Sequence, residues 1–103
     1  MKLQHVGYFL VLCDELNFNR TAARCSVTQP TVTFAIRSLE NLCGGPLFVR
    51  KPAVRLTPLG AAVRSHLQKI DREFEMLFET AARNRRDRAA ARETRLRRVL
   101  PLR

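Results

Sequence analysis

Residues 26–45 of the chain read SVTQPTVTFAIRSLENLCGG, and this stretch decides the fold. Thr28 is favoured at the position before a helix, and Pro30 fits the first turn, where no backbone N–H is needed. Glycines at positions 44 and 45 stop a helix. The stretch therefore predicts a helix that is capped by Thr28 and ends at about residue 43. Its apolar residues recur at helical spacing and form a buried stripe of Val32, Ile36, Leu39 and Cys43.

The residues before this stretch predict two further helices, over about 3–16 and 20–25. In the first helix, apolar residues follow the spacing of a one-sided core helix, and they are Val6, Phe9, Leu10 and Cys13. Asn19 is expected to cap the second helix. Ser26, Val27 and Thr28 are expected to form a tight turn into the third helix, with Val27 buried.

The residues after the stretch predict a hairpin and a long helix. Two short extended runs, 47–50 and 54–56, are joined by Lys51-Pro52-Ala53, which is typical of a small hairpin with a cationic tip. Thr57 is expected to cap a helix over residues 58–82. The apolar residues of this helix are spaced 4-3-4-3-4, a heptad pattern that predicts packing along a second helix. They are Val63, Leu67, Ile70, Phe74, Leu77 and Ala81.

Three helices followed by a hairpin predict a mainly α fold, a winged helix-turn-helix domain over residues 1–57. The helix over 58–82 is expected to form a homodimer, because a single small domain covers only the first turns of its apolar seam. Residues 83–103 contain nine arginines and two acidic residues. We expect them to form an Arg-rich tail that is helical at first and frays later.

The chain has 103 residues and a formal net charge of +10, from 19 basic and nine acidic side chains. Such an excess favours a polyanionic partner. Nucleic acid is favoured over a membrane, because the basic parts of the chain lack the Trp or Phe anchors of a membrane-binding helix.

The outward face of the third helix carries residue types that read double-stranded DNA. Gln pairs with adenine, Arg with guanine, and apolar groups contact the thymine methyl, while a helix N-terminus attracts phosphate. The residues expected to contact DNA from this helix are Thr28, Gln29, Pro30, Thr31, Thr33, Phe34, Arg37 and Ser38. Those expected to reach the DNA backbone or minor groove from the hairpin are Arg50, Lys51 and Arg55.

Other classes of protein are disfavoured by the sequence. Cys13, Cys25 and Cys43 lack metal-ligand spacing and have only two histidines beside them, so we expect free core thiols and no metal or cofactor. The chain also lacks a nucleophile–base pattern and a Gly-rich phosphate loop, so no catalytic residue is expected. Without a signal peptide or an apolar run of roughly 20 residues, a cytoplasmic location is expected.

Residues 3–60 resemble the N-terminal DNA-binding domain of LysR-type transcriptional regulators. The motifs that carry the resemblance stand in the family's order over more than half of the chain. They are Tyr8-Phe9, Leu16-Asn17-Phe18, Val27-Thr28-Gln29-Pro30, Ile36-Arg37-Ser38-Leu39-Glu40, Pro46-Leu47-Phe48, Arg50 and Leu56-Thr57-Pro58-Leu59-Gly60. Phe34 stands where the family very often has Arg, His or another polar residue.

The resemblance implies a bacterial cytoplasmic regulator that is associated with the nucleoid through DNA. Its dimers would pair through the linker helix and bind a partly palindromic operator. The family's effector-binding domain, of about two hundred residues, is expected to be absent, and with it any small-molecule site. The alternative is a dimeric protein-interaction module that pairs through residues 63–81 with a full-length regulator.

Overall fold

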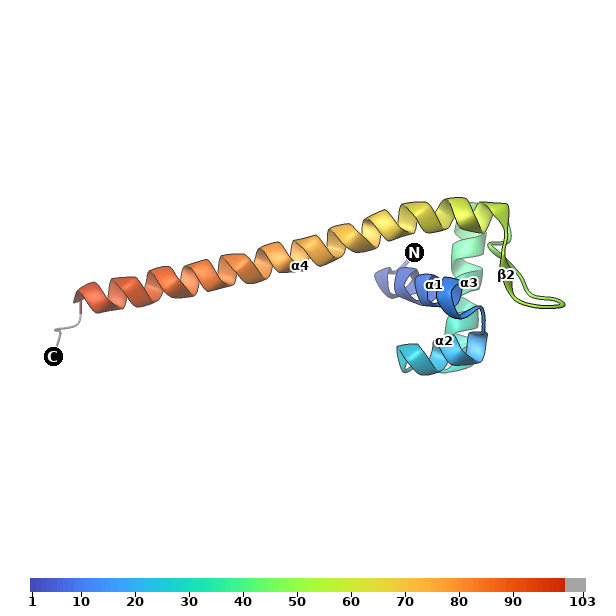
Figure 1. Ribbon diagram of the computed structural model, residues 1–103, viewed down its shortest axis with the longest axis horizontal. Coiled ribbons are helices and arrows are strands. Elements are labelled where there is room, and N and C mark those ends of the chain that lie inside the picture. The colour runs from blue at the N-terminus through green and yellow to red at the C-terminus, as the bar shows by residue number, and fades with distance from the viewer. Residues whose placement is uncertain (100–103) are drawn as a thin grey trace. The chain divides into compact units, whose positions relative to one another are not determined.

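The computed structural model describes residues 1–99, and the side chains up to residue 93. The elements are α1 (Leu3–Glu15), α2 (Phe18–Cys25), α3 (Gln29–Cys43), β1 (Phe48–Val49), β2 (Arg55–Leu56) and α4 (Pro58–Val99) (Figure 1). The chain divides into two units, residues 1–71 and 72–103. The predicted order of three helices, a hairpin and a long helix is therefore confirmed.

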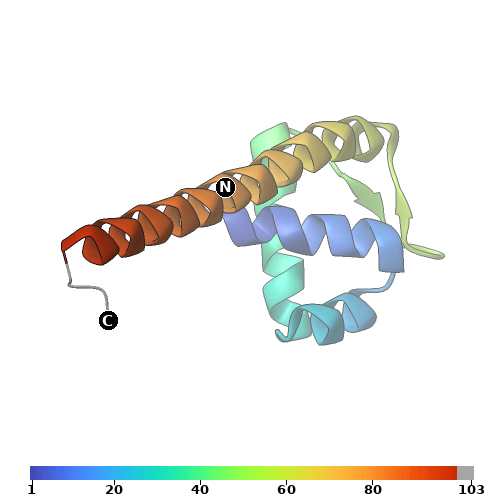
Figure 2. The same ribbon diagram turned by 60° about the vertical axis from the view of Figure 1, so that its left-hand side comes forward.

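Helices α1, α2 and α3 pack against one another and enclose the core of the first unit (Figure 2). The buried core residues are Val6, Phe9, Leu12, Ala22, Val32, Ala35, Ile36, Leu39, Leu47, Phe48 and Leu67. The predicted stripe of α3 is confirmed, with Cys43 partly buried at its end. On α1, Leu12 was not predicted but is fully buried, because α1 packs on both α2 and α3 and needs a wider apolar face.

Two helix starts differ from the prediction. Asn17, not Asn19, caps α2, since its Oδ1 accepts a bond from the Arg20 backbone N–H at 2.8 Å and helix formation begins at Phe18. Thr28 occupies the position before α3 as predicted, but its side chain makes no capping bond. Its hydroxyl instead lies 2.9 Å from the hydroxyl of Thr31. The turn before it is tight, with Ser26 in the left-handed conformation and Val27 packed against the core.

The hairpin is antiparallel, with Phe48 opposite Leu56 and Val49 opposite Arg55. Thr57 connects it to α4 with three hydrogen bonds. Its N–H donates to the Leu47 carbonyl at 3.0 Å, and its hydroxyl donates to the Pro46 carbonyl at 2.8 Å and accepts from the Gly60 N–H at 2.9 Å. The predicted cap at Thr57 is therefore confirmed.

Helix α4 continues beyond residue 82, the predicted end of the linker helix, to Val99. The tail is thus helical over 83–99, and any fraying after that lies outside the described residues. Two residues of the predicted dimer seam contact the core of the first unit instead of lying free for a partner helix. Val63 packs against the core, and Leu67 is a core residue with 5% of its surface exposed.

The cysteines are free and half-buried. Cys13 and Cys43 pack against the core, and burial raises the pKa of the Cys13 thiol to about 11. Among the described residues, no group of three or more His, Cys, Asp or Glu side chains could hold a metal ion. No helix in the described part of the chain is long and apolar enough to cross a membrane.

Two glycines provide a matched test of the packing between the hairpin and α4. A Cβ at Gly60 would meet the backbone carbonyl oxygen of Leu47 and would lie 2.8 Å from Cδ1 of Leu56. A Cβ at Gly7 on α1 would meet nothing within 4 Å. Gly60→Ala is expected to lower the free energy of unfolding by about 1–3 kcal/mol. Gly7→Ala is expected to raise it by about 0.5–1 kcal/mol, because Gly is a poor helix former. Urea denaturation measures both, and a Gly60→Ala variant as stable as the wild type would contradict this packing.

Candidate nucleic-acid interface

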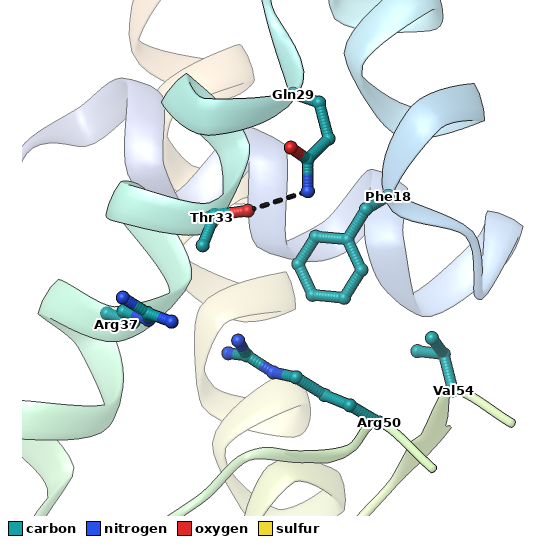
Figure 3. Close-up of a pocket in the computed structure, with 6 residues that line it drawn as sticks. All are labelled: Phe18, Gln29, Thr33, Arg37, Arg50 and Val54. Carbon is teal, nitrogen blue, oxygen red and sulfur yellow. Dashed lines mark hydrogen bonds between the residues drawn. The ribbon is translucent and has the colours of Figure 1, made fainter. Parts of the chain in front are cut away.

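The face of α3 that is predicted to read DNA lies at the surface of the domain. Gln29 and Arg37 are exposed, and Thr33 between them is half-buried. The Gln29 side-chain amide donates to the Thr33 hydroxyl at 3.0 Å (Figure 3). This bond orients the amide, which has a second N–H and a carbonyl oxygen to offer to a base edge.

An open hollow of about 290 Å³ adjoins this face. Its lining comes from α2, α3 and the hairpin, and consists of Phe18, Gln29, Thr33, Arg37, Arg50 and Val54. Figure 3 shows the Arg37 and Arg50 side chains at this hollow, together with the Gln29–Thr33 pair. Two guanidinium groups beside amide and hydroxyl donors suit a phosphate or another electron-rich group.

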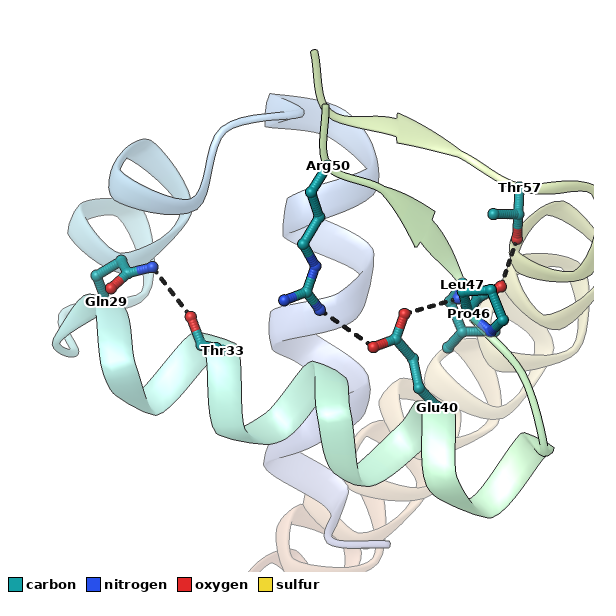
Figure 4. A network of polar contacts seen from close by, with 7 residues as sticks. All are labelled: Gln29, Thr33, Glu40, Pro46, Leu47, Arg50 and Thr57. Carbon is teal, nitrogen blue, oxygen red and sulfur yellow. Dashed lines mark hydrogen bonds and ion pairs between the residues drawn. The ribbon is translucent and has the colours of Figure 1, made fainter. Parts of the chain in front are cut away.

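Arg50 has structural partners that the sequence does not predict. Its guanidinium forms an ion pair with Glu40 at 3.1 Å and lies 5.1 Å from the centre of the Phe18 ring. The other carboxylate oxygen of Glu40 accepts from the Leu47 backbone N–H at 2.8 Å (Figure 4). The Arg50 side chain is 33% exposed and that of Glu40 is 16% exposed. The pair therefore fixes the start of the hairpin to α3, and DNA contact by Arg50 stays a prediction.

The other predicted contact residues lie at the surface around this face. Thr28, Pro30 and Thr31 are exposed at the start of α3, and Ser38 is half-buried further along it. On the hairpin, Lys51 and Arg55 are exposed. The structure thus brings Gln29, Thr33, Arg37 and Arg50 together at one hollow, and the other six residues do not line it.

Phe34 is unusual for its position, because 65% of its surface is exposed although it is a large apolar residue. Its ring meets the ring of His5 edge to face, with 6.2 Å between the ring centres. His5 is buried, and burial, followed by the positive charges of Lys2 and the N-terminus, lowers the pKa of its imidazole. The buried His5 ring therefore supports Phe34 from α1.

The fold and this surface define a DNA-binding domain of the winged helix-turn-helix class. Residues 3–61 match the model of the family described as bacterial regulatory helix-turn-helix protein, lysR family. The match covers more than half of the chain, and the chain therefore belongs to the LysR family. The predicted family and winged helix-turn-helix fold are confirmed, and the alternative of a pure interaction module is not favoured.

Individual relatives agree with this assignment. The chain is 44% identical to the Hca operon transcriptional activator HcaR of Escherichia coli over 61 residues, which are 58% of this chain and 21% of HcaR. It matches the BenM DNA-binding domain in complex with catB site 1 DNA at a TM-score of 0.76 and 26% identity, covering 81% of this chain and 94% of that one. The DNA complex of Vibrio fischeri DarR matches at a TM-score of 0.77 and 29% identity, covering 84% of this chain and 30% of DarR. The chain thus spans about a fifth of the length of HcaR and less than a third of DarR.

The Glu40–Arg50 pair and the Arg24–Asp14 pair allow a matched test of how much the Glu40 contacts stabilise the domain. The second pair is longer, at 3.6 Å, and its side chains are 54% and 70% exposed. Glu40→Ala is expected to lower the free energy of unfolding by about 1–3 kcal/mol, because it leaves the Leu47 N–H and Arg50 without their partner. Asp14→Ala is expected to change it by no more than about 0.5 kcal/mol. Thermal or urea denaturation compares the two, and equal effects would show that the Glu40 network does not stabilise the domain.

Proposed function

We propose that this protein binds double-stranded DNA as a homodimer and regulates transcription in the cytoplasm of a bacterium, on the nucleoid. Each α3 enters the major groove at one half-site of a partly palindromic operator, and each hairpin contacts the neighbouring backbone or minor groove. The chain acts by binding rather than by catalysis, in keeping with relatives that are named as regulators. The observation that carries the proposal is the row of Gln29, Thr33 and Arg37, of which Gln29 and Arg37 are exposed, beside a hollow that is lined by two arginines.

Within this proposal the contact residues have different tasks. Gln29 and Arg37 read base edges, because an amide and a guanidinium can each make paired hydrogen bonds to one base. Phe34 contacts a thymine methyl, since its exposed ring offers no polar group. Thr28, Thr31, Lys51 and Arg55 contact phosphates, which orient the domain without reading sequence. The DNA-bound structures of BenM and DarR support the partnership with DNA.

Gln29→Ala tests base readout, with Lys51→Ala as its control. The specific site is first selected from a pool of random duplexes. Gln29→Ala is expected to weaken binding to that site by about 1–3 kcal/mol, with little effect on unrelated DNA, because only a base contact discriminates between sequences. Lys51→Ala is expected to weaken binding to both duplexes alike. If Gln29→Ala also weakens both alike, Gln29 contacts the backbone and the proposed readout is wrong.

Dimerisation is assigned to the part of α4 that the core of the first unit does not use. Leu77 and Phe78 are 57% and 64% exposed, and Phe74 and Ala81 lie on the same face of the helix by their spacing. Exposed aromatic and aliphatic side chains are unfavourable in water, and burying one Leu or Phe gains about 1.5–3 kcal/mol. A second copy of this face would cover it, which supports a linker helix centred on residues 70–81.

Leu77→Asp tests this assignment against Met76→Asp, its neighbour on a different face of α4. Both wild-type side chains are more than half exposed, so neither change disturbs the core of the first unit. Leu77→Asp is expected to sediment as a monomer at micromolar concentration, since two buried carboxylates would oppose pairing. Met76→Asp is expected to remain a dimer. The assignment of Leu77 to the dimer interface would be contradicted if the wild type sedimented as a monomer or if Leu77→Asp remained a dimer.

A further inference from the structure

We propose that α4 carries a second nucleic-acid-binding surface, an arginine stripe that binds the phosphate backbone of duplex DNA without reading its sequence. The stripe consists of Arg85, Arg88 and Arg92. This second surface is additional to the one in the proposed function, because it contains no residue of α3 or of the hairpin.

The three arginines lie on one face of the helix. Their separations of three and four residues are those of neighbours on a helical surface. All three are exposed, and together with Ala89 and Ala91 they line a shallow hollow of about 570 Å³. The shared hollow shows that their side chains border one continuous area.

The acidic residues of the segment stand on other faces. At 3.6 residues per turn, Asp87 and Glu93 each lie about a third of a turn from the centre of the stripe. Arg83 and Arg86 also lie on the far side. The stripe therefore has no acidic residue between its arginines on this face of the helix.

The chemistry of this face favours DNA phosphate over other partners. A guanidinium offers two parallel N–H groups that match the oxygens of a phosphate. The stripe spans about 10 Å along the helix, and duplex DNA carries one charge for about every 1.7 Å of its axis. Ala89 and Ala91 are the apolar residues beside the arginines, and alanine is too small to anchor in a lipid layer.

A second copy of this chain is the competing occupant. The acidic side chain of Glu73 borders the apolar face of α4, about a quarter of a turn from its centre, and Glu75 and Glu79 lie about a third of a turn or more from that centre. They do not occupy the face that the stripe continues, since Ala81 lies four residues before Arg85 and seven before Arg88. A partner helix that pairs through its own apolar face would therefore present apolar side chains, and not these carboxylates, toward the arginines.

The experiment compares two pairs of arginines with the same spacing in the full chain. Arg85→Gln/Arg88→Gln removes two charges from the stripe, and Arg83→Gln/Arg86→Gln removes two from the far side. Glutamine keeps the helix propensity close to that of arginine, and circular dichroism checks that helix content is unchanged. Fluorescence anisotropy with a labelled duplex of random sequence gives the slope of log affinity against log salt concentration.

The stripe variant is expected to make this slope less steep by about 2 for each chain bound, because about one counterion is released for each phosphate contact. The far-side variant is expected to keep the slope of the wild type. The proposal would be overturned if all three proteins had the same slope, or if the two variants reduced the slope by the same amount. The proposal would also be overturned if the stripe variant kept the slope of the wild type but dimerised more weakly in sedimentation. The same holds if it kept that slope but lost binding to anionic lipid vesicles. Random DNA is used so that failure of base readout by Gln29 leaves this result interpretable.

Discussion

Burial of the inner face of α3 is the constraint on which the rest of the DNA-binding domain depends. Val32, Ile36 and Leu39 expose 1% of their surface or less. Emptying one such site costs about 2–5 kcal/mol, so rotation of α3 about its own axis is strongly disfavoured. Since each residue of a helix turns by about 100°, fixing this face also points Gln29, Thr33 and Arg37 outward. The direction of the reading face is thus a consequence of core packing.

Glu40 extends this constraint from α3 to the hairpin. One carboxylate oxygen binds the guanidinium of Arg50, and the other binds the N–H of Leu47. Thr57 makes the equivalent connection between the hairpin and the first turn of α4. Helix α3 and the hairpin are consequently held as one rigid body. Their separation is therefore fixed before a duplex contacts both of them. Such preorganisation reduces the entropy that binding would otherwise cost.

The sequence predicts features that depend on neighbours along the chain, and it fails where distant residues decide. Periodicity and caps are local, so the three helices and the hairpin are predicted well. Asn17 and Asn19 are equally good caps by composition, and the choice between them depends on where Phe18 packs in the fold. The Glu40–Arg50 pair joins residues ten positions apart. No helical or strand spacing brings such residues together, so only the path of the chain reveals that Arg50 has a structural partner.

Helix α4 shows why periodicity alone does not identify a partner. Val63 and Leu67 share the spacing of Leu77 and Ala81, yet the first two belong to the core and Leu77 is exposed. The same spacing continues into the face that bears Arg85 and Arg88, where the chemistry changes from apolar to cationic. The spacing alone therefore does not separate core residues from exposed ones, whereas burial and side-chain chemistry do. Inserting one residue between Ala81 and Arg85 would turn the arginines by about 100° relative to the apolar face that precedes them, so the alignment of these two faces depends on an unbroken helix.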